Sequence, residues 1–243
     1  MKLHAGLLLA GVIAMGLSGS AQAGPRAIVE LFTSQGCSSC PAADKLLGEL
    51  AKDSSVVALS LPVDYWDYLG WKDTLASPLH TAKQRAYSRA RGDREIYTPQ
   101  AVVNGVIPVI GSDKSDIDDA ISQTRGKAMT LPVQLVTTGD KLTVSVPEAK
   151  DGAAKGEVWI YGVKSTAPVA IGRGENAGRS ITYYNVTRRF VKVGDWDGKA
   201  ASWTIPADQI RGDGVDCAAV LLQGGTAEKP GVMLGATFAT LAK

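Results

Sequence analysis

Two cysteines separated by two residues, Cys37 and Cys40, have the type and spacing that most directly predict chemistry in this chain. They follow the apolar run 27–32 and precede a helix-like segment that begins at Pro41. The first turn of a helix has unpaired backbone N–H groups and a partial positive charge, which together stabilise a thiolate. A thiolate attacks disulfides, and two intervening residues allow the second sulfur to reach the first. The spacing therefore predicts a pair that cycles between dithiol and disulfide.

Two other interpretations of the cysteine pair stay open. Half of a zinc site would need two further ligands, and Cys217 and His80 are the residues of the usual types outside the N-terminal segment. A purely structural disulfide would close a very short loop and so remove little entropy from the unfolded chain. The position between a strand and a helix favours the redox pair.

The N-terminal segment predicts export. An apolar run, residues 5–17, follows Lys2, and Ala21-Gln22-Ala23 precedes Gly24. This is the form of a secretory signal peptide, residues 1–23, cleaved after Ala23. The run is shorter than the roughly 20 apolar residues that span a bilayer, and no other stretch is long enough. We expect a periplasmic or secreted protein without a membrane span, in a compartment where disulfides persist.

The amino-acid composition argues against several classes of function. The chain has 26 Lys+Arg and 24 Asp+Glu, so no basic excess indicates a nucleic-acid partner. One of the two histidines, His4, lies in the predicted signal peptide, which leaves His80. One histidine cannot build a multi-histidine metal site, and a Ser-His-Asp triad would have to use it. We expect an exposed or helix-capping His80, and we predict no cofactor and no metal.

Strand and helix patterns alternate in the first half of the chain. The pattern predicts strands at 27–32 and 55–63, and helices at 41–52, 77–91 and 112–124, the last with Ser112 as its N-cap. Asn104-Gly105 is a strong hairpin signal between strands 100–104 and 106–110. Alternating strands and helices with a hairpin predict an α/β fold with a mixed sheet.

The second half has a different character, because good helix signals are absent and Gly, Asp and Pro turns separate short strands. The strand-like segments are 131–138, 141–147, 157–163, 180–193, 201–205, 218–223 and 232–240. This pattern predicts an all-β, sandwich-like domain. The expected organisation is a signal peptide (1–23), an α/β domain (24–128) and a β-sandwich-like domain (129–243).

The order of elements then resembles the thioredoxin superfamily over residues 27–125: strand, Cys-x-x-Cys, helix, strand, helix, Thr98-Pro99, hairpin and a final helix. The resemblance implies a thioredoxin-like domain, a mixed sheet flanked by helices. It also implies a cis-proline at Pro99 that faces the cysteine pair, and a buried acid at Glu30 on the strand before the cysteines.

Two further segments, 63–71 (VDYWDYLGW) and 173–179 (RGENAGR), resemble a bacterial family of exported thioredoxin-like proteins of unknown function. Members of that family share an additional β-rich C-terminal part, and the family supplies no assigned substrate. By its residues alone, 173–179 is a turn with polar side chains, with a binding loop as the alternative.

Two function classes follow. In the first, the protein is an exported thiol–disulfide oxidoreductase that acts on protein thiols or disulfides and uses an unidentified redox partner. Cys37, expected nearer solvent, is the nucleophile and Cys40 resolves the mixed disulfide. Glu30 could accept a proton from Cys40, and Pro99 would shape the substrate groove. The second class is a non-enzymatic periplasmic binding or scaffold protein, with soft-metal binding by the thiols as one form.

Aromatic residues are expected around the cysteines. Tyr65, Trp66 and Trp71 follow the carboxyl end of a strand, where ligands bind in α/β sheets, so we predict that they line the groove with Thr98. Packing between the domains is the alternative.

Cys217 begins an apolar strand and is either a buried, inert thiol or a resolving thiol that meets Cys37.

Overall fold

The computed structural model describes residues 24–150 and 154–241, and the predicted signal peptide, residues 1–23, lies outside these ranges. The helices of the described residues are α1 (Cys40–Leu50), α2 (Pro78–Arg91) and α3 (Lys114–Gln123), with short 3-10 turns at Asp67–Leu69 and Ala207–Gln209. The strands are β1 (Ala27–Thr33), β2 (Val56–Pro62), β3 (Gln100–Val103), β4 (Ile107–Ile110), β5 (Gln134–Thr138), β6 (Lys141–Val146), β7 (Gly156–Ala170), β8 (Ser180–Trp196), β9 (Ala201–Pro206), β10 (Cys217–Gly225) and β11 (Pro230–Thr240). None of the helices in the described ranges is long and apolar enough to cross a membrane.

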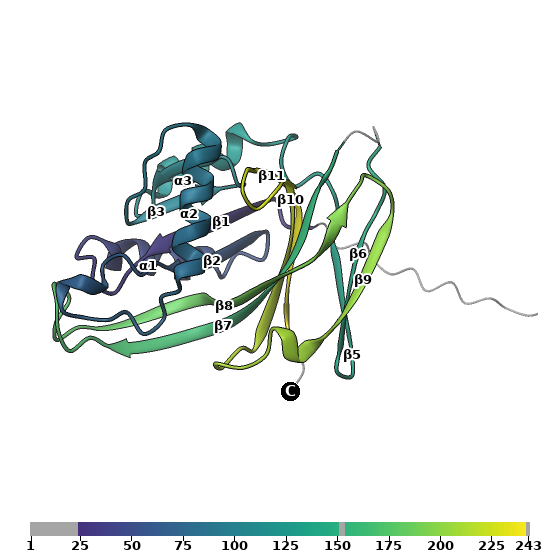
Figure 1. Ribbon diagram of the computed structural model, residues 1–243. Coiled ribbons are helices and arrows are strands. Elements are labelled where there is room, and N and C mark those ends of the chain that lie inside the picture. The colour runs from purple at the N-terminus through teal and green to yellow at the C-terminus, as the bar shows by residue number, and fades with distance from the viewer. Residues whose placement is uncertain (1–23, 151–153, 242–243) are drawn as a thin grey trace, which may run out of the picture.

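One mixed sheet of eight strands runs through both halves of the chain, in the order β11-β10-β7-β8-β2-β1-β3-β4. Helix α2 covers one face of its β1–β2 part, and α1 and α3 cover the other (Figure 1). Strands β1 and β2 are parallel neighbours. Their carboxyl ends meet at the same edge of the sheet, so the loop that carries Cys37 emerges beside the segment that follows β2.

The alternation of β1 explains how both faces are buried. Ile28 and Phe32 pack on the face that contains Tyr87 of α2, while Val29 and Leu31 pack on the face that contains α1 and α3. A strand covered on both faces has an almost continuous apolar sequence, which is the run that the sequence shows at this position.

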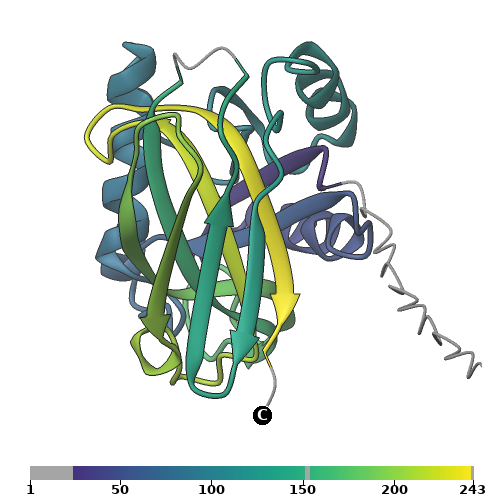
Figure 2. The same ribbon diagram turned by 90° about the vertical axis from the view of Figure 1, so that its right-hand side faces the viewer.

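The C-terminal half adds a second, three-stranded antiparallel sheet, β5-β6-β9. This sheet lies over the β7–β10–β11 end of the large sheet (Figure 2). Leu142 and Val144 of β6 share a core with Val158 and Ile160 of β7 and with Val220 of β10. The β-rich part therefore buries apolar side chains between two facing layers.

Strand β8 connects the two halves of the chain. It pairs with β2 in parallel at Ser60 and Val186, and the Asn185 side-chain amide donates a hydrogen bond to the Ala58 carbonyl at 3.0 Å. The parts predicted as 24–128 and 129–243 therefore share one hydrogen-bonded sheet, which β8, β7, β10 and β11 extend on the β2 side.

Strand β7 is longer than its sequence indicates, because it continues through Pro168 to Ala170. Beyond Val163 it pairs with β8 alone, since its pairing with β10 ends at that residue. Proline is tolerated on such a free edge because the missing N–H faces no partner strand.

Two details at helix starts differ from expectation. Asp113, not Ser112, caps α3, because its side chain accepts a hydrogen bond from the Asp116 N–H at 3.0 Å. His80 is neither exposed nor a cap: it is 1% exposed and its Nδ1 lies 2.8 Å from the Pro62 carbonyl oxygen. Burial lowers the pKa of His80 to about 4, so the ring is neutral at pH 7.

Candidate functional site

The two cysteines lie where β1 passes into α1. Cys37 is in the loop and Cys40 is the first residue of the helix, and they form a disulfide with a Cα–Cα distance of 5.4 Å. Pro41 occupies the first helical turn, where a missing N–H breaks no hydrogen bond. The Ser39 hydroxyl lies 3.4 Å from Cys37 Sγ, so one spacer residue contacts the sulfur directly.

Both cysteines are buried in the disulfide form. Cys37 is 1% exposed and Cys40 is 0% exposed, so the expectation that Cys37 lies nearer solvent is wrong for this state. The connection between β7 and β8, residues 171–179, lies against the cysteine loop and forms a cover over it.

Asn176 and Glu175 hold the cover in place. The Asn176 side-chain amide, itself 1% exposed, donates hydrogen bonds to the carbonyl oxygens of Gln35 at 2.9 Å and Cys37 at 2.8 Å. The Glu175 carboxylate accepts a hydrogen bond from the Ser38 N–H at 3.1 Å. The segment 173–179 is thus a turn with polar side chains, and those side chains hold the cysteine loop.

Gln35 anchors the loop from the other side. Its backbone N–H donates to the Asp73 carboxylate at 2.8 Å, and its side-chain oxygen accepts from the Trp71 indole N–H at 2.8 Å. Trp71 also lies under the cover, since a Cβ at Gly172 would be 3.2 Å from its ring. Trp71 therefore supports both the loop and its cover.

The Thr98–Pro99 bond is cis, as the resemblance implied. The Thr98 hydroxyl accepts a hydrogen bond from the Trp66 indole N–H at 2.8 Å. The Trp66 backbone and Cβ fit closely against Gly36, where an added Cβ would lie 3.1 Å from Trp66 Cβ. Trp66 therefore connects the cysteine loop to the Thr98-Pro99 segment.

Pro99 and Tyr65 complete the predicted groove residues. Pro99 is buried and lies on the α1 side of the sheet: a Cβ at Gly111 would be 3.2 Å from Pro99 Cβ and 3.4 Å from Ala43 Cβ. Tyr65 is half-buried beside Trp66, with ring centroids 6.4 Å apart. Burial raises the pKa of Tyr65 above its usual value, so its hydroxyl stays protonated.

Glu30 lies on the face of the sheet opposite α1. Its carboxylate accepts a hydrogen bond from the Tyr87 hydroxyl, and its Oε1 lies 3.5 Å from Lys83 Nζ. Both partners belong to α2, and the helix that carries Cys40 covers the other face. The structure therefore does not bring Glu30 together with the cysteines.

Asp44 is a buried acid on α1 that the sequence analysis did not single out. It lies four residues after Cys40 in α1, which places both on one side of the helix, and it is 2% exposed. Burial raises the pKa of Asp44 to about 8, with the Thr33 hydroxyl lowering it and the Asp73 carboxylate raising it. A carboxyl group with this pKa exchanges protons near neutral pH.

Asp44 belongs to a buried polar cluster behind the cysteine pair. Asp44 and Asp73 both raise the pKa of the Tyr183 hydroxyl through their charges, after burial itself, and burial raises the pKa of Asp73 as well. Among the described residues, neither Asp44 oxygen nor the Tyr183 hydroxyl has a hydrogen-bond partner. Clusters of buried ionisable groups with shifted pKa values are typical of functional sites.

Cys217 does not lie near the cysteine pair. It is 5% exposed and begins β10, which three strands separate from β1 in the sheet. Burial raises the pKa of its thiol to about 11. These features favour the buried, inert thiol over a resolving thiol. In the described part of the chain, no group of three or more His, Cys, Asp and Glu side chains is placed to hold a metal ion.

Comparisons with known proteins extend over most of the chain. The model of a family described as a protein of unknown function (DUF1223) matches residues 28–223. A structural-genomics crystal structure from Agrobacterium tumefaciens has 33% identity and a TM-score of 0.80, and the match covers 92% of this chain and 100% of that chain. HBP35 of Porphyromonas gingivalis has a TM-score of 0.59 at 12% identity, with 90% of this chain and 76% of that chain covered, which is a likeness of fold alone. No curated protein matches the chain.

Proposed function

The chain belongs to the DUF1223 family, whose function is unknown, and we propose that it is an exported thiol–disulfide oxidoreductase that acts on protein thiols or disulfides. The observation that carries the proposal is the Cys37–Cys40 disulfide at the start of α1. Residues 24–128 would form a thioredoxin-like unit, supported by the order of elements and by the cis bond before Pro99.

The proposed exchange begins at Cys37 in the reduced protein. The Cys37 thiolate attacks one sulfur of a substrate disulfide, a mixed disulfide forms, and the other substrate sulfur leaves as a thiolate. The Cys40 sulfur then attacks Cys37 Sγ and releases the remaining substrate sulfur. Two electrons pass from the cysteine pair to the substrate, and the reverse sequence oxidises a substrate dithiol. The start of α1 and the Ser39 hydroxyl stabilise the attacking thiolate.

We assign proton exchange with Cys40 to Asp44 rather than to Glu30. Asp44 is one helical turn from Cys40 and buried with it, whereas the contacts of Glu30 are with Lys83 and Tyr87. When Cys40 attacks, its thiol must lose a proton in surroundings that exclude water. Because the pKa of Asp44 is about 8, this carboxyl group can take the proton in one direction of exchange and return it in the other.

A trapping experiment tests the proposal. The Cys40→Ser variant keeps the attacking thiol but cannot resolve the mixed disulfide. Exported in bacterial cells, it should accumulate high-mass species that a reductant converts to the monomer on gels. The matched Cys37→Ser variant, with one thiol of the pair at Cys40, should give none. Equal patterns for the two variants would contradict the proposed roles.

One observation favours the alternative class, a non-enzymatic periplasmic binding or scaffold protein. The cysteine loop is held by Asn176, Glu175 and Asp73 and both sulfurs are covered, as in a disulfide that only fastens a loop. In that case neither single-cysteine variant would trap a partner.

Export itself is part of the proposal. The mass of the protein recovered from the periplasm tests it, because the mature chain should begin at Gly24.

A further inference from the structure

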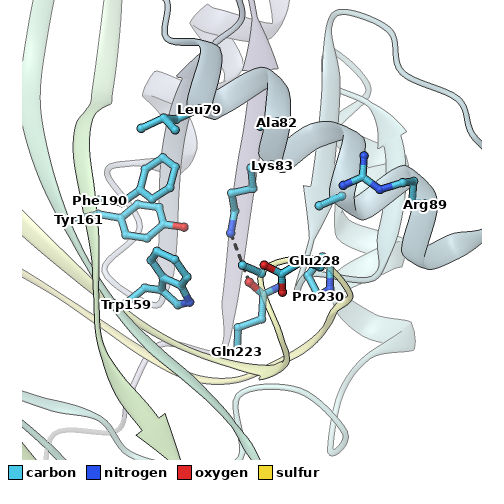
Figure 3. A pocket seen from close by; sticks show the side chains of 12 residues that line it. Leu79, Ala82, Lys83, Arg89, Trp159, Tyr161, Phe190, Gln223, Glu228 and Pro230 are labelled. Atoms are coloured by element: carbon cyan, nitrogen blue, oxygen red, sulfur yellow. Dashed lines mark hydrogen bonds between the residues drawn. The ribbon is translucent and has the colours of Figure 1, made fainter.

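A cavity of about 240 Å³ lies between α2 and the strands β7 and β8, closed at one end by the turn between β10 and β11 (Figure 3). It is on the face of the sheet opposite α1, and its lining shares no residue with the surroundings of the cysteine pair. The cavity is therefore separate from the proposed redox site.

One wall of the cavity is aromatic. Trp159, Tyr161 and Phe190 stand side by side along β7 and β8 (Figure 3). The Tyr161 and Phe190 rings are stacked with centroids 5.2 Å apart, and Trp159 meets Phe190 edge-on at 5.9 Å. These contacts fix the rings against one another, so the wall is formed before any ligand arrives.

The opposite wall is a stripe of α2. Leu79, Ala82 and Ala86 recur at helical spacing and all line the cavity. The two alanines leave space where longer side chains would fill it. Leu79 is 57% exposed, which places a large apolar side chain in water at the rim. An apolar body between the alanines and the rings would cover this surface.

Two basic side chains of α2 line the cavity, Lys83 inside it and Arg89 at an exposed position. Lys83 Nζ lies 3.2 Å from Gln223 Oε1 and 3.5 Å from Glu30 Oε1. It also lies 5.0 Å from the centre of the Tyr87 ring and 5.6 Å from that of Tyr161. Glu30 is fully buried behind Lys83 and does not line the cavity, so the positive end of the pair faces the open space.

Lys83 and Tyr161 both keep their protons, which leaves this end of the cavity positively charged and able to donate hydrogen bonds. The Glu30 carboxylate and the two tyrosine rings raise the pKa of Lys83 well above its usual value against the effect of burial, so the ammonium stays charged. Burial raises the pKa of Tyr161 to about 12, so its hydroxyl keeps its proton as a possible donor. Glu228, the one acidic lining residue, is at the solvent-exposed turn, where water screens its charge.

We propose that this cavity is a binding site for a small monocarboxylate with an alkyl body. The carboxylate would meet the Lys83 ammonium and the Tyr161 hydroxyl, and the alkyl chain would lie between the aromatic wall and the alanine stripe. The cavity volume of about 240 Å³ is far more than one water molecule needs. The cavity admits an alkyl chain of medium length, and we take the eight-carbon chain of octanoate as the probe, with its end emerging beside Leu79.

Calorimetric titration of the purified protein with three probes of equal chain length tests the site. Octanoate, octanol and octylamine differ only in the polar end. We expect saturable binding of octanoate to one site per chain, with a dissociation constant at least about tenfold lower than that of octanol, and no saturable binding of octylamine. Equal affinities for the three probes, or no binding of octanoate up to millimolar concentrations, would overturn the proposal.

Two variants locate the site. Ala82→Leu fills the cavity from an exposed helix position and should weaken octanoate binding at least about tenfold, while Ala42→Leu, an equal change at an exposed position of α1, should leave it unchanged. The double variant Lys83→Met with Glu30→Gln removes both charges together, which avoids an unpaired buried carboxylate. It should bind octanoate no better than octanol. Full octanoate affinity in either cavity variant, with folding verified by circular dichroism, would place the ligand elsewhere and refute the assignment.

Discussion

Replacing Asp44 with asparagine should remove a pH dependence of stability that the buried carboxyl group imposes. In the folded protein the pKa of Asp44 is about 8, against 3.8 for an unperturbed aspartate. The unfolded chain thus loses its proton near pH 4, whereas the folded protein keeps it until about pH 8. Between these values the unfolded state binds fewer protons, so the free energy of unfolding falls as pH rises.

The magnitude follows from the linkage relation. One proton of difference changes the free energy of unfolding by about 1.36 kcal/mol per pH unit. From pH 5 to pH 7 the Asp44 contribution therefore falls by about 2.7 kcal/mol. Asparagine has nearly the same shape but cannot ionise, so the variant lacks this loss. His80 acts in the opposite sense, because its folded pKa of about 4 lies below 6.5 and its contribution is lost as pH falls. The difference between wild type and variant isolates Asp44.

Urea unfolding of the oxidised proteins at pH 5, 6, 7 and 8 measures this difference. The free energy of unfolding of Asp44→Asn, relative to that of the wild type, should rise steadily with pH. Any effect of the buried amide itself should be the same at every pH. Asp119→Asn, at an exposed position of α3, is the matched control and should show no such trend. A wild-type minus Asp44→Asn difference that stays constant from pH 5 to pH 8 would refute the raised pKa and the assigned proton exchange.

Three further predictions concern the reduced cysteines. Ser39→Ala should slow alkylation of Cys37 at neutral pH about two- to fivefold, because the hydroxyl 3.4 Å from Sγ is lost; an unchanged rate in an iodoacetamide time course would contradict this. Asn176→Ala should lower the free energy of unfolding by about 2–3 kcal/mol, from two buried hydrogen bonds, and should speed labelling of Cys37 by loosening its cover; stability equal to the wild type in urea would show that the cover is not held this way. Cys217→Ala should leave the rate of disulfide exchange unchanged, since three strands separate β10 from β1, and a slower exchange would restore the resolving role for Cys217.

Local patterns predict much of this fold. The apolar run at β1, the hairpin signal at Asn104-Gly105 and the strand-like segments after residue 130 all correspond to observed elements. These signals are local, because they depend on periodicity and on turn residues. The pairing of β8 with β2 is different: it joins residues about 130 positions apart through Asn185 and Ala58, and nothing in either segment specifies its partner.

The candidate site also combines features that local sequence patterns predict with features that they do not. The pairing of Cys37 with Cys40 and the cis bond before Pro99 could be predicted from the sequence and its resemblance to the thioredoxin superfamily. The separation of Glu30 from the cysteines could not be predicted, because strand alternation puts Glu30 and Leu31 on opposite faces but does not say which face α1 covers. A signal for Asp44 was present: it is a carboxylate four residues after Cys40 on the apolar side of a helix, where a charge conflicts with burial.

The proposed function depends on disulfide exchange between the Cys37–Cys40 pair and other proteins. The most direct measurement mixes the reduced protein with oxidised insulin, quenches samples with an alkylating agent and follows both partners by mass spectrometry. We predict that Cys37 and Cys40 become oxidised together as insulin thiols appear, at a rate well above that of the Cys37→Ser variant. A folded, fully reduced protein whose Cys37 and Cys40 stay reduced while insulin keeps its disulfides would contradict the account.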